Sequence, residues 1–321
     1  MDVSPAVWGA TLAGILAVIA IDLVAVSRRP HRPTMRESTA WVFFYIALAL
    51  AFGAVVAVAF GSRYAGEFYA GWLTEYSLSV DNLFVFVIIM SRFRVPATAQ
   101  QTVLIIGVIL ALVFRGIFIA LGAAAIARFS WVFYLFGAFL LYTAYKLFSH
   151  DEDEEDEFKG NALLRLVRRV VPTAPDYDGI RLRTTVAGRR LFTPMLVVMV
   201  AIGTTDVLFA LDSIPAIYGL TSEPYLVLTA NIFALMGLRQ LYFLLGNLLK
   251  KLVYLSLGLS VILAFIGVKL VLHAMHEYDL DTRLGFDGEI SLGVSLWVIV
   301  GTLAATTIAS IIASRRSPSQ D

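Results

Sequence analysis

The amino-acid sequence alternates between long apolar runs and shorter polar or charged segments. Most of the apolar runs reach about 20 residues, the length that an α-helix needs to cross the hydrocarbon core of a bilayer. The pattern therefore predicts nine membrane-spanning helices. The predicted spans are residues 4–26, 40–60, 67–90, 98–121, 131–148, 193–217, 225–247, 252–273 and 291–313.

Composition agrees with this pattern, because 59% of the residues are hydrophobic and only 15% are charged. The fold class that follows is an all-α polytopic membrane protein in a lipid bilayer. The chain has no cysteine, which excludes disulfides, thiol redox chemistry and cysteine-ligated zinc. Its formal net charge of +1 gives no reason to expect nucleic acid as a partner. A homo-oligomer is compatible with the sequence but is not indicated by it.

Lysine and arginine predict the orientation of the chain, because they accumulate in cytoplasmic loops. If the N-terminus lies outside, eighteen of the 25 basic residues fall on the inner side and three fall on the outer side. The four others lie within spans. We therefore expect an outer N-terminus and a cytoplasmic C-terminus.

The third and sixth spans carry similar motifs, EYSLSVDN from Glu75 and DVLFALDS from Asp206. Further matches follow in the same order through the next two spans of each set. Because each repeat has an odd number of spans, the second would cross the membrane in the opposite sense, as in secondary transporters with inverted repeats. The paired positions are Glu75 with Asp206, Asp81 with Asp212, Asn82 with Ser213, Arg115 with Arg239, and Lys146 with Lys269.

This repeat divides the chain into segments of different character. They are two N-terminal spans in 1–66, the first three-helix repeat in 67–148, a cytoplasmic charged loop in 149–192, the second repeat in 193–273, an outer acidic loop in 274–290, and the final span with a cytoplasmic tail in 291–321.

Four carboxylates lie inside the predicted spans. With a rise of about 1.5 Å per residue, Glu75, Asp81 and Asp206 fall within roughly 5 Å of the bilayer centre, and Asp212 about 10 Å toward the outside. Acids at this depth must be protonated, pair with a buried arginine, or hold a cation. Arg115 and Arg239 are the predicted pairing or gating partners.

The neighbouring polar side chains offer only oxygen ligands, namely Asn82, Ser213 and Asn231 beside the four acids. Such a set suits hard or borderline cations such as Mn²⁺, Mg²⁺ or Ca²⁺. Pro215 removes a backbone hydrogen bond in the sixth span, so we expect an irregular helix next to Asp212. A purely structural alternative is that the acids and arginines only fix helix packing.

Two other features of the sequence bear on which functions are possible. There is no Walker A motif, so ATP-driven pumping is not expected, and transport rather than an enzymatic reaction is predicted. The acidic run 151–157 is either a solvated linker or a device that concentrates or senses cations at the inner mouth.

The segments EYSLSVDNLFVFVIIM, GTTDVLFALDSIPAI and NIFALMGLRQLYFLL resemble the signature segments of the TerC/Alx family of bacterial membrane proteins. The resemblance implies a multi-pass protein of the bacterial inner membrane, related to the LysE-type transporter superfamily and associated with manganese homeostasis and tellurium resistance. It implies export of Mn²⁺ as substrate, with no resident cofactor. The acidic pairs of the family fall on Glu75, Asp81, Asp206 and Asp212.

Two rival functions remain beside Mn²⁺ export, whose coupling could be to protons, to sodium or to neither. A tellurium-resistance protein acting on oxyanions would need Arg115 and Arg239 as its binding groups, whereas four central acids form a poor anion site. A non-transporting membrane scaffold would use the acids only to hold helices together.

Overall fold

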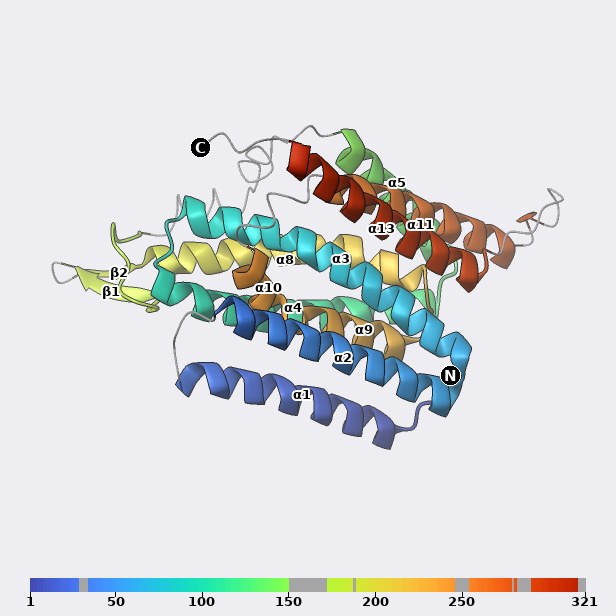
Figure 1. The fold of residues 1–321 in the computed structure, drawn as a ribbon, viewed down its shortest axis with the longest axis horizontal. Helices are drawn as coiled ribbons and strands as arrows, with labels where there is room; N and C mark the ends of the chain where they lie inside the picture. Colours follow the sequence, from blue (N-terminus) through green and yellow to red (C-terminus); the bar gives the residue numbers. More distant parts are fainter. Residues whose placement is uncertain are drawn as a thin grey trace.

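The structure is a computed structural model that describes residues 1–28, 34–149, 172–186, 189–245, 254–278, 280–281 and 290–316. Long helices lie side by side along the longest axis of the molecule (Figure 1). Their bounds are α1 Pro5–Arg28, α2 Met35–Phe60, α3 Ser62–Arg92, α4 Ala97–Ile126, α5 Val132–Ser149, α8 Pro194–Tyr218, α9 Pro224–Leu235, α10 Leu238–Leu245, α11 Leu255–Glu277 and α13 Leu292–Arg316.

The prediction of an all-α membrane protein is confirmed. Within the described residues, eight stretches are long and apolar enough to cross a bilayer, and they correspond to the second through ninth predicted spans. The first predicted span forms α1, whose apolar helix Pro5–Ile21 is shorter. The acidic run 151–157 lies outside the described residues, as does most of the outer acidic loop 274–290.

Local sequence signals set several helix ends. Thr34 caps α2, where its hydroxyl oxygen accepts a hydrogen bond from the backbone N–H of Glu37 at 3.3 Å, as in a capping box. Pro194 and Pro224 begin α8 and α9, where a missing N–H costs nothing. Gly61 joins α2 to α3 with a φ of +107°, a conformation that favours glycine.

The seventh span is broken, which the sequence did not predict. It was expected as one helix over 225–247, but α9 ends at Leu235 and α10 begins at Leu238. Gly237 has a φ of +90°, and a Cβ atom there would lie 3.0 Å from the ring of Tyr45. The left-handed backbone and the nearby tyrosine together explain why a single glycine interrupts this apolar run.

The irregularity expected in the sixth span at Pro215 is absent from the described backbone, because α8 stays helical from Pro194 to Tyr218. The proline lies in the last turn of α8, where losing one hydrogen bond does not break the helix.

Helices α3, α4, α8 and α9 form the centre of the bundle. Helix α3 packs against α8 and α9, and α4 packs against the same two helices. Helices α5, α11 and α13 lie together on one side, and α1 and α2 lie on the opposite side (Figure 1). Each helix of the first predicted repeat thus contacts its equivalent in the second, α3 with α8, α4 with α9 and α5 with α11.

Helices α5 and α11 are antiparallel and very close. The ring of Phe133 near the start of α5 lies 4.8 Å from that of His273 near the end of α11. A Cβ atom at Gly137 would lie 2.7 Å from Val271 and 2.9 Å from the carbonyl oxygen of Gly267. Small residues at such a crossing let backbones approach, which is how helices associate in lipid.

The charged loop 149–192 contains a β-hairpin that the sequence did not predict. Strands β1 Arg183–Val186 and β2 Arg189–Phe192 pair in antiparallel register, with Arg183 opposite Phe192. Thr184, Thr185 and Val186 are β-branched and favour a strand over the expected irregular loop. The loop contacts the bundle where the hydroxyl of Tyr177 donates to the carbonyl oxygen of Phe93 at 2.7 Å, at the end of α3.

The close contact of α5 with α11 predicts that Gly137→Ala is destabilising. The added methyl group would overlap Val271 and a backbone oxygen, so the free energy of unfolding should fall by about 1–3 kcal/mol. Gly301→Ala on α13 is the matched control, because nothing lies within 4 Å of its Cβ position. Thermal unfolding in detergent checks both variants, and an equal melting temperature for the two would contradict the prediction.

Candidate functional site

Four helices bring a set of polar side chains together in the apolar centre of the bundle. Glu75 comes from α3, Arg115 from α4, Asp206 from α8 and Asn231 from α9, and all four are buried, with 0 to 3% of their surface exposed. They lie among large clusters of buried aliphatic and aromatic residues from the same helices. Charges in such surroundings persist only when they are paired or hold an ion.

Glu75 is the common partner within this cluster. Arg115 Nη1 donates a hydrogen bond to Glu75 Oε2, forming a fully buried ion pair. Asn231 Nδ2 donates to the same oxygen at 3.0 Å. Helices α3, α4 and α9 are therefore joined at one carboxylate oxygen.

Asp206 adds a second acid to this pair. It interacts electrostatically with both Arg115 and Glu75, attracted by the guanidinium and repelled by the carboxylate. Two acids therefore face one arginine, so the described part of the cluster carries an excess of negative charge when both acids are ionised.

Several buried polar atoms of the cluster have no hydrogen-bond partner among the described residues. Each such atom costs about 1–3 kcal/mol when it is left unsatisfied, so their concentration at one place is a signal of water or an ion. The atoms are Glu75 Oε1, Arg115 Nε and Nη2, and Asp206 Oδ2, and the buried hydroxyls of Thr74, Ser79 and Ser213 on α3 and α8 also lack a partner.

The remaining predicted site residues fall into three groups. Asn82 and Ser213 are buried on α3 and α8. Asp81 and Asp212 lie on the helical backbone of the same two helices, but their side chains are outside the described part. Arg239, the predicted equivalent of Arg115, lines a cavity whose lining contains neither Glu75 nor Asp206.

The structure brings four of the predicted site residues close to one another, Glu75, Arg115, Asp206 and Asn231. Their role in binding a substrate stays a prediction. Among the described side chains, no group of three or more histidine, aspartate or glutamate residues is close enough to hold a metal ion. Because the side chains of Asp81 and Asp212 lie outside this described part, the four-acid metal site stays a prediction.

One polar residue near the site was missed by sequence reasoning. Thr74 precedes Glu75 and is fully buried with an unpartnered hydroxyl. Its signal is present in the sequence as a series of small polar residues at helical spacing along α3, but a threonine in an apolar helix usually bonds to its own backbone.

Comparison with known proteins gives a consistent family. Residues 60–317 match the sequence model of the integral membrane protein TerC family. An uncharacterized membrane protein of Myxococcus xanthus is 42% identical over 318 residues, covering 99% of this chain and 96% of the relative. An uncharacterized membrane protein of Mycobacterium tuberculosis is 45% identical over 322 residues, covering 98% and 81%.

Another relative has a more specific name. Alx of Escherichia coli, whose name proposes a role as a membrane-bound redox modulator, is 36% identical over 314 residues, covering 95% of this chain and 94% of the relative. No solved structure matches the chain.

The buried ion pair predicts a large effect of removing one partner. Arg115→Met leaves the Glu75 carboxylate without its cation, so the free energy of unfolding should fall by about 3–5 kcal/mol. Replacing both partners, as in Glu75→Gln with Arg115→Met, should recover part of this loss because no uncompensated charge remains.

The control is the exposed pair of Arg181 and Asp178, whose nearest atoms are 3.6 Å apart. Arg181→Met should cost at most about 1 kcal/mol, as is typical of surface ion pairs. A double-mutant cycle on thermal unfolding in detergent gives the coupling energy. Additive losses for the two buried residues would show that the pair does not act as a unit.

Proposed function

The chain belongs to the TerC family of integral membrane proteins, and from this premise we propose that it is a secondary transporter that exports divalent metal cations. Mn²⁺ is the first candidate, and the direction is out of the cytoplasm across the bacterial inner membrane. The metal ion is the substrate, and the transport activity is not enzymatic.

The observation that carries this proposal is the excess of acids over arginine in the cluster around Glu75. In the described part, Glu75 pairs with Arg115, and Asp206 interacts electrostatically with both. Asp81 and Asp212 add two acids on the same helices. A cation relieves this imbalance and supplies a partner for oxygen atoms such as Asp206 Oδ2, whereas an oxyanion would increase the repulsion.

The pairing of Glu75 with Arg115 supports a site in which a cation and a guanidinium compete for one carboxylate. A buried acid without a metal needs another positive partner, and the guanidinium provides it. Binding of a divalent cation would release Arg115 from Glu75, so that metal and arginine compete for the same carboxylate. This competition keeps the site electrically balanced when it is empty and when it is loaded.

The contacts between helices support the proposed inverted repeat. A two-fold axis that exchanges α3 with α8 and α4 with α9 would also exchange the α3–α9 contact with the α4–α8 contact, and both contacts occur. Helices α5 and α11 pack antiparallel, as an inverted pair should. In transporters of this type the substrate lies where the two repeats meet, and Glu75 and Asp206 come from the two repeats.

The broken seventh span is a further feature typical of transporters, in which interrupted helices line substrate paths. Its equivalent in the first repeat, α4, is continuous from Ala97 to Ile126, so the two repeats differ here. The proposed topology has the N-terminus outside. It places the hairpin that carries Arg183, Arg189 and Arg190 on the cytoplasmic side, where basic residues accumulate.

Two other functions remain as alternatives. The name of the Escherichia coli relative points to redox regulation, but this chain has no cysteine, so it could not act through a thiol. A scaffold would use the Glu75–Arg115–Asn231 contacts only to hold helices together, and a tellurium-resistance protein would move an oxyanion.

Efflux from proteoliposomes tests the proposal. Purified protein should move Mn²⁺ down its gradient, and Asp81→Asn, Asp206→Asn and Asp212→Asn should each reduce the rate to that of empty liposomes, because a hard cation loses a charged ligand. Asp178→Asn is the matched control, because this acid lies on the described loop at the surface. An imposed proton or sodium gradient identifies the coupling ion.

The alternatives give different outcomes in the same assay. A scaffold moves neither Mn²⁺ nor tellurite. An oxyanion transporter moves tellurite and loses this activity in Arg115→Met. Full Mn²⁺ efflux by all three asparagine variants would refute the acidic site even if the protein transports the metal.

A further inference from the structure

The polar face of α3 continues beyond the central cluster toward the end of the bundle where the N-terminus lies. Glu67, Gly71, Thr74, Glu75, Ser79 and Asn82 recur at spacings of three, four or one, so they lie on one face of the helix. All of them are buried. From Glu67 to Glu75 the helix rises about 12 Å, which is two turns.

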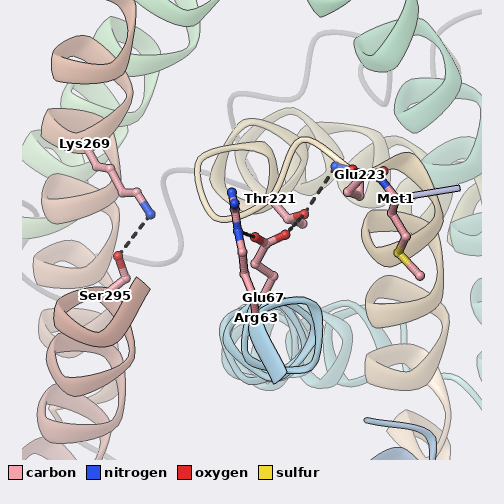
Figure 2. Close-up of polar contacts among 7 residues, drawn as sticks. All are labelled: Met1, Arg63, Glu67, Thr221, Glu223, Lys269 and Ser295. Atoms are coloured by element: carbon pink, nitrogen blue, oxygen red, sulfur yellow. Dashed lines mark hydrogen bonds and ion pairs between the residues drawn. The ribbon is translucent and has the colours of Figure 1, made fainter. Parts of the chain in front are cut away.

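Glu67 lies at the end of this face that is nearest to the surface of the bundle. Arg63 Nε donates to Glu67 Oε1 at 3.0 Å, and Thr221 Oγ1 donates to Glu67 Oε2 at 2.7 Å (Figure 2). The Arg63 side chain is 82% exposed, whereas that of Glu67 is 9% exposed. The Glu67 carboxylate therefore lies just beneath the surface, beside the turn that follows α8.

Below Glu67 the helices close tightly around Gly71. A Cβ atom at this glycine would lie 3.1 Å from Ile217 of α8 and 3.6 Å from the Cβ atom of Ala230 of α9. Thr74 follows one turn further in. Glu67 and Thr74, on the two sides of this apolar layer, are seven residues apart, which is about two turns of α3 or about 10 Å.

On the inner side of this layer, polar atoms of α3 lack partners among the described residues. They are Thr74 Oγ1, Glu75 Oε1 and Ser79 Oγ, and each belongs to a side chain with no exposed surface. Hydroxyl and carboxylate oxygens in this order are ligands that a hard cation can exchange one after another. The face thus carries oxygen atoms on both sides of the apolar layer at Gly71.

We infer that Glu67 is an outer relay site for the cation, and that its contacts with Arg63 and Thr221 close the outer end of the path in this structure. The inference rests on the proposed transport function and extends it to a residue outside the central cluster. The cation passes from Glu75 by way of Thr74 to Glu67. Its arrival displaces the guanidinium of Arg63, as at Glu75 it displaces Arg115.

The competing interpretation is that Glu67 only fixes the turn after α8 to α3. Glu223 offers a matched control for this structural role. It lies on the same turn, and its carboxylate contacts the amino group of Met1 at 2.7 Å (Figure 2), but it lies outside the polar face of α3. Both acids thus tie the turn to another segment, and only Glu67 continues the row of buried oxygens.

The first experiment compares Glu67→Gln, Glu223→Gln and the unchanged protein in Mn²⁺ efflux from proteoliposomes. Glu67→Gln should reduce the rate about tenfold, because a charged ligand is replaced by a neutral one of equal size, while equilibrium binding of Mn²⁺ at the central cluster is retained. Glu223→Gln should leave the rate unchanged. Equal rates for all three overturn the relay and leave the proposed function standing, whereas no efflux by the unchanged protein removes both.

A second experiment uses the absence of cysteine from the chain. In intact cells, Thr74→Cys should react with a membrane-impermeant maleimide added outside, and Mn²⁺ should slow the reaction. Ser77→Cys is the control, because Ser77 bonds to the carbonyl oxygen of Leu73 and lies on another face of α3. If Glu67→Gln does not fold, this labelling decides alone, and an unreactive Thr74→Cys overturns the path.

Discussion

The buried ion pair of Glu75 and Arg115 is the constraint on which the centre of the structure depends. Neither charge could stay at this depth alone, so the helices that carry them, α3 and α4, must be held in one register. Asn231 extends the same constraint to α9, and Asp206 extends it to α8. Together these interactions hold four helices at the proposed substrate site. Any movement of the helices there must first give the two charges other partners.

Close helix packing is the second constraint, and it explains which parts can move together. Apolar side chains gain little by leaving lipid for a protein interior, so helices in a bilayer associate through fitted surfaces. Gly137 and Gly267 bring α5 and α11 into backbone contact, and Gly107 of α4 lies close to the side chain of Ile202 of α8. These contacts hold α5 with α11 and α4 with α8. The bundle is thus better suited to tilting of whole helix pairs than to movement of single helices.

The sequence predicted the spans well, because length and apolar composition are nearly sufficient to identify a helix in lipid. It also predicted Arg115 and Arg239 as possible partners of the buried acids, since a charge at that depth needs a partner, but it did not single out the pair of Glu75 with Arg115. It did not predict the break at Gly237, because the conformation of one glycine depends on the neighbouring Tyr45, which no local pattern reveals. Glu67 was missed because an acid near a span end resembles an ordinary surface residue until its burial is known. Pro215 led to the opposite error, because the sequence predicted an irregular helix at this residue. The proline lies in the last turn of α8, and the helix stays regular.

Apolar layers close the described bundle on both sides of the cluster. Toward the N-terminal end they include Phe68, Trp72 and Ile217 around Gly71, with the contacts of Glu67 beyond them. Toward the hairpin a deep apolar layer lies between Asn82 and Phe93, and α10 contributes to it after the break at Gly237. Under the proposed function, a cation that enters from the cytoplasm must part this layer, and the break allows α10 to shift without carrying α9 and its Asn231 along. The members of this layer are Leu83, Phe86, Ile89, Met90, Met195, Val198, Ile202, Leu238, Leu241 and Tyr242.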